Sequence, residues 1–487
     1  MRMINWRIIF KILGSLLFIE SFFMLWCLVM AFVHHEDDVM AFVMSAMITF
    51  GSAFLFLFVG RHSENSLSRR DAYVVVTVAW LVFSFFGMLP FLIHGSVSDL
   101  SEAFFETMSG FTTTGVTTIQ DVERLPHGIL FWRSLMQWIG GLGIVFFTIA
   151  LLPSLVGGSV KVFAAEATGP MRSKMHPRLS TTAKWIWSIY VLLTVACGFS
   201  FWAAGMDWFD ALNYSMTTTA TGGFSTHNGS TVFFNSVSIE YLAILFQFLA
   251  GINFTLLYMA LFKWKMGSLF RNSEFKMYII TILIATAWIM YLLLTRLDYD
   301  FEEAFRSALF QVVSFITTTG LSNTDAGAWP HITWIILMFL MFTGACSGST
   351  TGGFKSIRVL MLLKVLRNEL RHIIHPNAVL PVKLSGQSIP QNRLVTLLAL
   401  FTLYVISLLL VFTIMIVSGI DITNAATIAL SLISNVGAGL DTNMGAQMSW
   451  ADLSDGIKWL CSFLMLVGRL EIVAVLVLFT RAFWKEN

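Results

Sequence analysis

The sequence predicts an all-α integral membrane protein, in which four tandem helix–pore-loop–helix repeats surround a central pore and follow a leading two-helix hairpin. Three observations support this fold class. The 487 residues are 56% hydrophobic and only 12% charged, which leaves too little polar surface for a water-soluble globule. Apolar stretches long enough to cross about 30 Å of hydrocarbon as helices recur along the chain. Four short polar stretches, each ending in a glycine, lie between them.

The apolar stretches predict membrane-spanning helices in a fixed order. They are Ile8 to Phe32, Met40 to Gly60, Ala72 to Ile93, Ile129 to Leu152, Trp185 to Ala204, Tyr241 to Phe262, Met277 to Leu294, Leu394 to Ile416 and Ile457 to Phe483. Basic residues precede the first stretch, but its apolar run is too long for a secretory signal and no small-residue cleavage site follows. We therefore expect it to be a retained helix.

No linker or low-complexity tract separates the predicted units, so we expect one compact membrane domain. The leading hairpin covers residues 1–65, and the four repeats cover 66–160, 161–265, 266–385 and 386–487. The third repeat also contains a predicted intramembrane gate loop.

The distribution of charge predicts the orientation. When loops are assigned alternately to the two sides, 24 of the 30 Lys and Arg residues fall on one side, which the positive-inside rule makes the cytoplasm. Both termini are then cytoplasmic. Most acidic residues fall on the opposite side, where they either concentrate cations at a pore mouth or are simply the acids left outside. The four cysteines are far apart in apolar segments and indicate small core residues.

The four polar stretches predict one supersecondary unit repeated four times. They read SEAFFETMSGFTTTG, DALNYSMTTTATGG, SALFQVVSFITTTG and NAATIALSLISNVG, and their alanine-to-glycine pairs are Ala103 and Gly115, Ala211 and Gly223, Ala308 and Gly320, and Ala425 and Gly437. Each begins with a half-helix too short to span, with expected starts at Asp99 or Ser101, Asp207, Glu302, and Asp421 or Thr423. Such half-helices would aim their partially negative C-terminal ends at the bilayer centre, where they favour a cation.

The turn after each half-helix predicts a cation filter. The candidate residues are Thr112, Thr113 and Gly115, Ala220, Thr221 and Gly223, Thr317, Thr318 and Gly320, and Ser434, Asn435 and Gly437. Backbone carbonyls can replace the water of a monovalent cation, and glycine permits the left-handed backbone that this requires. Because the side chains differ between the turns, we expect carbonyls rather than a ring of identical side chains to coordinate the ion.

With these four turns and the leading hairpin, the chain resembles the membrane subunits of Trk-type potassium uptake systems (TrkH and TrkG) in the Trk/Ktr/HKT superfamily. The resemblance covers essentially the whole chain. It implies that potassium is the transported ion, that the protein is a homodimer in a bacterial inner membrane, and that a TrkA-type cytoplasmic ring of nucleotide-binding domains regulates it. Glycine at all four filter positions implies potassium preference, but no turn reads TVGYG, so we expect a looser filter than in a channel.

The third repeat contains a candidate gate. Gly344, Ser347, Gly348, Ser349, Thr350, Thr351, Gly352 and Gly353 lie in a segment too rich in glycine and hydroxyl residues to continue a helix comfortably. At membrane depth such a segment must lie against protein or water. We interpret it as an intramembrane loop under the filter, which the resemblance favours; the alternative is a wide kink with no gating role.

Arg469 is the second candidate gate residue, because it falls mid-span, where a charge is expensive. We expect it to plug or tune the pore together with the 344–353 loop, as the resemblance implies; the alternative is a structural charge pair with an acid other than Glu471. Lys458, Arg133 and Arg306 lie closer to segment ends and can snorkel, so we give them no role.

The sequence gives little support to an enzyme, since no nucleophile–base pair or metal-spaced His/Cys cluster is apparent. A passive potassium transport subunit is the first hypothesis. A sodium- or proton-coupled secondary transporter is the alternative, although Glu20, Glu106 and Glu471 are almost the only intramembrane carboxylates. A third is the potassium-binding subunit of a pumping ATPase. The basic inner loops 156–182 and 355–391 either dock the regulatory ring or anchor the protein to anionic lipid.

Overall fold

The computed structural model describes residues 4–63, 67–143, 179–439 and 450–485. Within them the regular structure is helical, apart from one antiparallel pair of two-residue strands, β1 (Lys383–Leu384) and β2 (Gln387–Ser388). Six spans are long and apolar enough to cross a membrane, and two bent helix pairs raise the number to as many as eight. The predicted all-α membrane fold is confirmed.

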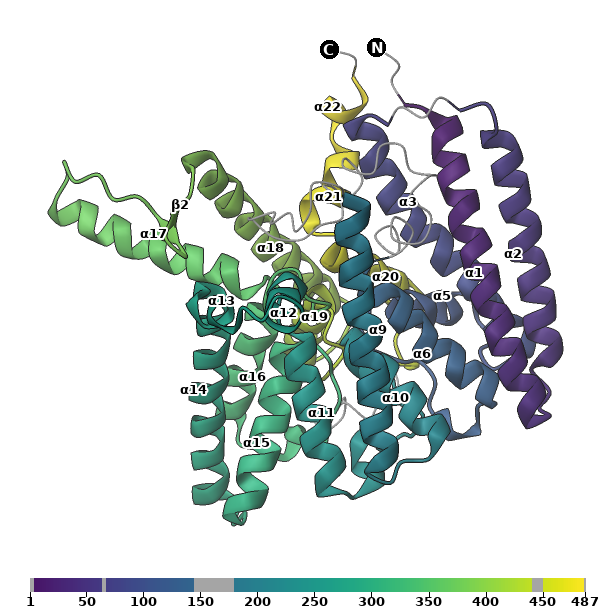
Figure 1. Cartoon of the computed structure of the whole chain (residues 1–487), viewed down its shortest axis with the longest axis horizontal. Coiled ribbons are helices and arrows are strands. Elements are labelled where there is room, and N and C mark those ends of the chain that lie inside the picture. The colour runs from purple at the N-terminus through teal and green to yellow at the C-terminus, as the bar shows by residue number, and fades with distance from the viewer. Residues whose placement is uncertain (1–3, 64–66, 144–178, 440–449, 486–487) are drawn as a thin grey trace.

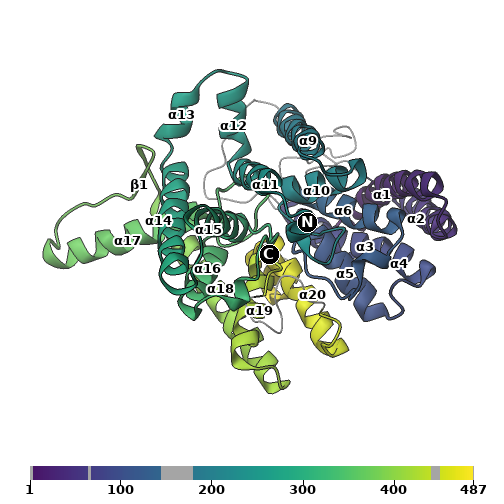
Figure 2. The ribbon, with the colours of Figure 1, turned by 90° about the horizontal axis from the view of Figure 1, so that it is seen from below.

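The long spans match the predicted ones closely. They are α1 (Trp6–His34), α2 (Val39–Gly60), α3 (Arg69–Gly87) with α4 (Leu89–His94), α9 (Leu179–Ala203), α14 (Ser273–Arg296) and α18 (Gln391–Val417). The leading hairpin is α1 and α2, which lie side by side at one edge of the molecule (Figures 1 and 2). Glycine lets the two helices approach closely, since a Cβ on Gly14 would lie 2.8 Å from the backbone nitrogen of Leu57.

Four short helices correspond to the predicted half-helices. They are α5 (Leu100–Phe111), α10 (Trp208–Ala220), α15 (Phe301–Ile316) and α19 (Ile422–Ser434). An aspartate is the N-cap residue of each, namely Asp99, Asp207, Asp300 and Asp421. The expected start at Glu302 was wrong, because α15 begins at Phe301 and Glu302 lies within its first turn. An acidic residue at this end interacts favourably with the positive end of the helix dipole.

In the second, third and fourth repeats the helix that follows the filter turn is interrupted. α11 (Val237–Ala250) and α12 (Phe254–Leu261) meet at 103°. α20 (Asp455–Arg469) meets the segment Ile472–Phe479, which begins with α21 (Ile472–Leu476), at 114°. The predicted uninterrupted spans Tyr241 to Phe262 and Ile457 to Phe483 were therefore wrong. The break in the third repeat was predicted, and it separates α16 (His331–Thr343) from α17 (Ser356–Ile374).

At the breaks in the second and fourth repeats a glycine packs closely against a neighbouring half-helix. A Cβ on Gly251 would lie 2.9 Å from Cγ2 of Thr317, and one on Gly468 would collide with the carbonyl oxygen of Ile433. In the first repeat, α6 (His127–Gly141) ends in a Gly140–Gly141 pair. The rest of the predicted span Ile129 to Leu152 lies mostly outside the described residues, which stop at residue 143.

The remaining elements are short connections. They are η1 (Val122–Arg124), η2 (Ser230–Phe234), α13 (Met266–Arg271), η3 (Ala326–Ala328), η4 (Val477–Phe479) and α22 (Arg481–Trp484). The proposed boundary between the second and third repeats coincides with the start of α13, and the one between the third and fourth falls in the β1–β2 turn. The first two boundaries lie at or within undescribed residues, so the division into repeats stays a prediction.

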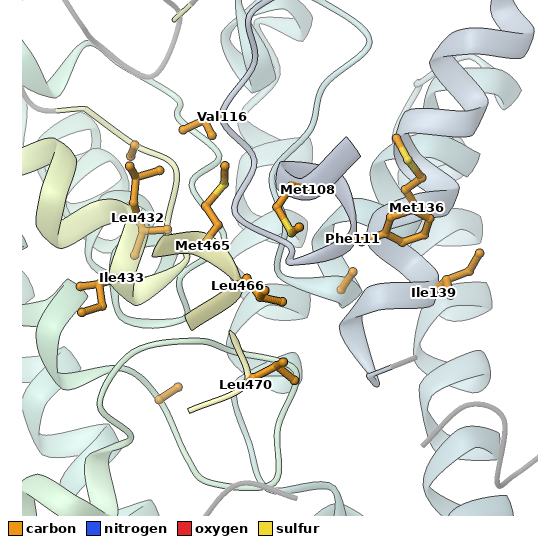
Figure 3. Close-up of a cluster of buried hydrophobic side chains, with 14 of the residues drawn as sticks. Met108, Phe111, Val116, Met136, Ile139, Leu432, Ile433, Met465, Leu466 and Leu470 are labelled. Carbon is orange, nitrogen blue, oxygen red and sulfur yellow. The ribbon is translucent and has the colours of Figure 1, made fainter. Parts of the chain in front are cut away.

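Buried apolar side chains join the first repeat to the fourth. Figure 3 shows Met108 and Phe111 of α5 and Met136 and Ile139 of α6 in one cluster with Leu432 and Ile433 of α19 and Met465 and Leu466 of α20. All of them are buried. Lipid tails are as apolar as these side chains, so close packing rather than escape from water holds such helices together.

Three basic residues that could snorkel instead form ion pairs with acids of other helices, and the pair of Arg133 is fully buried, which corrects the prediction. Arg133 Nε lies 2.8 Å from Glu106 Oε1, and Lys458 Nζ lies 2.6 Å from Glu102 Oε1. Arg306 Nη1 lies 2.7 Å from Glu240 Oε2 and ties α15 to α11. Partner acids on neighbouring helices, far away in the sequence, hold these side chains inside the protein.

Replacing Glu106 should destabilise the fold. Glu106→Gln leaves the buried Arg133 without its counter-charge, and the expected loss is about 3 kcal/mol in the free energy of unfolding. Arg124→Gln is the control, since its pair with Asp121 is 86% exposed on the arginine side and should change stability by less than about 1 kcal/mol. Denaturant unfolding in detergent measures both; equal losses would contradict the account.

Candidate cation filter and gate

The four turns after the half-helices have the same backbone conformation. Each contains a residue in the left-handed region followed two positions later by a left-handed glycine. The first residues are Thr113, Thr221, Thr318 and Asn435, with φ of 54–56°, and the glycines are Gly115, Gly223, Gly320 and Gly437, with φ of 76–84°. Threonine is seldom found there, because its branched Cβ crowds the backbone, and such residues are typical of functional sites.

Each turn continues directly from its half-helix through the same pair of hydrogen bonds. In the first turn the Thr113 N–H donates to Gly110 O (3.0 Å) and the Thr114 N–H donates to Ser109 O (2.9 Å). The other three turns repeat both bonds at the equivalent positions. These bonds satisfy the last carbonyls of each helix and terminate it by a left-handed cap. The C-terminal ends of all four half-helices therefore lead into the glycine positions.

The four glycines close the turns into a ring. A Cβ on any of them would collide with a backbone carbonyl oxygen of the next turn. The pairs are Gly115 with Gly222, Gly223 with Thr319, Gly320 with Val436, and Gly437 with Thr114. The turns therefore follow one another in chain order around one axis, and the fourth meets the first. Glycine is required both by the left-handed φ and by this approach.

Such a ring favours a cation. Carbonyl groups crowd around it from four chain segments, and four helix C-terminal ends add partial negative charge. Every predicted filter residue lies in the ring or at the end of its half-helix. The structure thus brings the predicted set together, while its role in ion binding stays a prediction.

Side chains support the first and third turns in the same way. The hydroxyls of Thr112 and Thr114 are 2.8 Å apart, as are those of Thr317 and Thr319. Two further serines repeat a second contact, because Ser109 Oγ donates to Val116 O and Ser314 Oγ donates to Leu321 O, both at 2.6 Å. In both turns the hydroxyls therefore satisfy polar groups within their own segment.

The fourth turn uses different side chains. Asn435 Nδ2 donates to Thr114 Oγ1 and to Met465 O, both at 2.9 Å, and so joins the fourth turn to the first turn and to α20. The hydroxyl of Ser434 lies 2.8 Å from that of Tyr404 in α18. This variety is consistent with a filter that depends on backbone geometry rather than on one conserved kind of side chain in every turn.

The 344–353 loop lies against the filter turns. The Gly352 N–H donates to Thr318 Oγ1 (2.7 Å), and the Gly353 N–H donates to Ser434 O (2.9 Å). Thr350 Oγ1 donates to Thr219 O at 3.1 Å. The loop therefore touches three of the four turns or their half-helix ends, as expected for a segment under the filter.

Arg469 binds the loop through a carbonyl. Its Nη1 donates to Thr350 O (2.8 Å), and its Nη2 donates to Gly140 O and Gly141 O (2.7 Å each). Arg469 therefore joins the loop to the end of α6. Glu471 forms an ion pair with Arg358, so the expectation that Glu471 need not pair with Arg469 is consistent with the structure.

Sequence reasoning missed two charged residues that hold the loop. Lys355 Nζ donates to Thr351 O, and its backbone is left-handed (φ 77°). Glu274 of α14 accepts hydrogen bonds from the Ser347 N–H (2.5 Å) and from Ser347 Oγ (3.1 Å). Glu274 is the second residue of its helix and resembles an ordinary capping acid, but its burial cannot be read from the sequence.

Acidic side chains at the ends of two half-helices stay ionised at neutral pH. The hydroxyl of Ser101, whose Oγ lies 2.5 Å from Asp99 Oδ2, lowers the pKa of Asp99. Hydrogen bonds from the Arg306 guanidinium lower the pKa of Glu302. Asp99 and Glu302 are therefore charged where their half-helices begin, and the charge of Glu302 is paired with that of Arg306.

Comparison with known proteins identifies the family. The TrkH family profile, described as a cation transport protein, matches residues 36–486. The chain belongs to the TrkH family. It is 36% identical over 99% of both chains to the Trk system potassium uptake protein TrkH of Halomonas elongata. It is 34% identical to the Escherichia coli K12 protein of the same name, over 99% of this chain and 100% of that one.

A solved structure from the TrkH family has the same fold. The crystal structure of the potassium transporter TrkH from Vibrio parahaemolyticus matches with a TM-score of 0.90 and 34% identity, and the match covers 99% of this chain and 100% of that chain. The predicted resemblance is confirmed, and the chain is a member of a family of multi-pass transport proteins of the bacterial inner membrane.

The close approach within the ring predicts that an alanine substitution destabilises the protein more at a filter glycine than at a matched glycine elsewhere. Gly437 and Gly95 have similar φ values (79° and 81°), but only the Gly437 Cβ would meet a carbonyl, while Gly95 has open space. We expect Gly95→Ala to lose about 1–2 kcal/mol in unfolding free energy and Gly437→Ala about 3 kcal/mol or more. Denaturant unfolding in detergent measures both, and equal losses would rule out the close approach.

Proposed function

We propose that the chain takes up potassium across the bacterial inner membrane through the ring of four filter turns. The observation that carries this proposal is the closed set of contacts from Gly115 through Gly223 and Gly320 to Gly437. A ring of backbone carbonyls at the ends of four half-helices replaces the hydration shell of a monovalent cation. Relatives along the full length of the chain are named potassium uptake proteins, which supports potassium as the transported ion.

The 344–353 loop and Arg469 form the gate in this proposal. The loop contacts the filter turns directly, and Arg469 adds a positive charge at Thr350 O. A cation leaving the filter is repelled by that charge and obstructed by the loop. Glu274 and Lys355 hold the loop in this position together with its hydrogen bonds to the filter turns.

A cytoplasmic TrkA-type ring controls the gate, and the protein works as a homodimer. Support comes from α17, which leaves the gate loop and projects from the body in both views (Figures 1 and 2). Its exposed apolar side chains recur at helical spacing at Leu363, Leu366, Leu370 and Ile373, a pattern typical of a helix that packs against a partner. The other proposed docking loop, 156–182, lies mostly outside the described residues; anionic lipid is the alternative partner of these basic segments.

A coupled transporter is the second candidate function, and Glu20 is the residue that favours it. Its carboxyl group is fully buried in α1, and neither oxygen has a hydrogen-bond partner among the described residues. A buried carboxyl of this kind is a possible proton carrier. Glu106 and Glu471 are engaged with Arg133 and Arg358, which favours passive conduction over a relay of carboxylates.

Isotope flux into proteoliposomes tests the proposed function. The purified protein should take up rubidium-86 down its gradient without a sodium or proton gradient, and Gly115→Ser should lower potassium over sodium selectivity. Uptake that requires a second ion gradient would contradict passive conduction and favour the coupled transporter. Unchanged selectivity in Gly115→Ser would contradict the filter assignment.

The same flux measurement tests the gate. Shortening the 344–353 loop, or Arg469→Ala, should raise rubidium flux in the absence of a cytoplasmic partner, because the obstruction or its positive charge is removed. Arg296→Ala is the control, since it removes a positive charge from the exposed end of α14. Flux that falls or does not change in the loop and Arg469 variants would contradict the gate.

A further inference from the structure

The second filter turn is held by the helix of the preceding repeat. Gln137 of α6 is fully buried, and its Nε2 donates to Gly222 O (2.8 Å) while its Oε1 accepts from the Phe224 N–H (3.0 Å). The two bonded residues lie on either side of the filter glycine Gly223. One side-chain amide therefore fixes the backbone on both sides of a filter position.

Arg133 extends this contact by one helical turn. It lies four residues before Gln137, on the same face of α6. Its Nη1 donates to Ser225 O (3.1 Å), and its guanidinium carbon lies 4.2 Å from the centre of the Phe224 ring. Gly222, Phe224 and Ser225 are thus all tied to α6, and the ion pair with Glu106 holds Arg133 in place.

A side chain at Gly222 would displace the amide of Gln137. Unlike Gly223, Gly222 does not have a positive φ, so its backbone conformation does not require glycine. A Cβ at Gly222 would instead fall among the amide atoms of Gln137, 2.5 Å from Oε1 and 2.8 Å from Nε2. The other turns have Thr114, Thr319 and Val436 at this position. In the second turn, the amide of Gln137 therefore occupies the space in which a side chain at position 222 would begin.

The next helix offers a natural comparison. A glycine lies at or next to the end of each of the four helices after a filter turn, namely Gly141, Gly251, Gly344 and Gly468, and the residues four positions earlier are Gln137, Gln247, Leu340 and Leu464. Gly141 and Gly251 also share a contact, because a Cβ on either would meet a tyrosine hydroxyl, that of Tyr190 or Tyr278. Gln247 is fully buried, yet neither of its amide atoms has a hydrogen-bond partner in the described part of the chain. The turn that follows it contains Thr319 where the second turn has Gly222.

We propose that Gln137 is a specificity-determining positioning residue, which sets the backbone geometry of the second filter turn through Gly222 and Phe224. This inference rests on the proposed function, because it assumes that the four turns select the ion. The second turn has Ala220 where the first and third have a threonine whose hydroxyl bonds within the turn. Gln137 supplies the support that this turn lacks.

Selectivity in proteoliposomes tests the proposal. Gln137→Ala and the isosteric Gln137→Glu, which loses the donor to Gly222 O, should each lower the potassium-to-sodium flux ratio by about three- to tenfold, the factor expected for a typical net hydrogen bond. Gln247→Ala is the matched control, since it removes the same buried amide without removing a described hydrogen bond, and should leave the ratio unchanged. An unchanged ratio in both Gln137 variants, or an equal fall in Gln247→Ala, would overturn the proposal.

A double variant tests the pairing of Gln137 with Gly222. Gly222→Ala alone should lose most potassium flux, because the new methyl group collides with the amide. Adding Gln137→Ala makes room for the methyl group, so flux should recover while selectivity stays low. If the double variant is no better than Gly222→Ala, the pairing is wrong.

The outcomes separate this proposal from the proposed function. If Gly115→Ser changes selectivity and the Gln137 variants do not, the filter stands and the role of Gln137 fails. If neither Gly115→Ser nor the Gln137 variants change selectivity, the filter assignment itself fails. Chromatography and unfolding of each variant in detergent identify any that fails to assemble, and Gln137→Glu, which keeps the shape of the side chain, then remains as the deciding variant.

Discussion

The approach of each filter glycine to the carbonyl of the next turn is the constraint on which the rest of the structure depends. This approach requires that the four half-helices end at the same level. It also requires a residue with a left-handed backbone conformation just after each half-helix, where the chain turns. The helices that follow the turns must then make room, and a glycine lies at or next to the end of each of them, namely Gly141, Gly251, Gly344 and Gly468. The outer ion pairs, such as Lys458 with Glu102, join α20 to α5 and so help to hold the ring closed.

The four turns of the ring share one backbone conformation, but different side chains hold them in place. Hydroxyl pairs support the first and third turns, Gln137 supports the second, and Asn435 joins the fourth to the first. Beneath the ring, in the described part of the chain, the repeats differ further, since the third contributes the 344–353 loop and the fourth contributes Arg469. In the proposed function, the shared backbone of the four turns conducts the ion, and the 344–353 loop and Arg469 control its passage.

The sequence predicts the shared backbone well because it depends on local chemistry. Four glycines at a fixed distance from an alanine, between long apolar stretches, are visible in the sequence alone, and so is the glycine-rich loop of the third repeat. The breaks after α11 and α20 were missed because one glycine in an apolar run also fits a continuous helix. The ion pairs of Arg133, Arg306 and Lys458 with Glu106, Glu240 and Glu102 cannot be read from the sequence, because these acids lie on other helices. The role of Gln137 depends on a contact 85 residues away and leaves only Gly222 as a trace in the sequence.

Direct observation of a bound ion is the sharpest test of the ring. A structure determined with thallium or rubidium in place of potassium, with anomalous scattering to identify the ion, would locate the binding site independently of flux. The account predicts ion density on the axis enclosed by Gly115, Gly223, Gly320 and Gly437, at the level of the carbonyls of the four turns. Density confined to another part of the membrane domain, with none inside the ring, would contradict it.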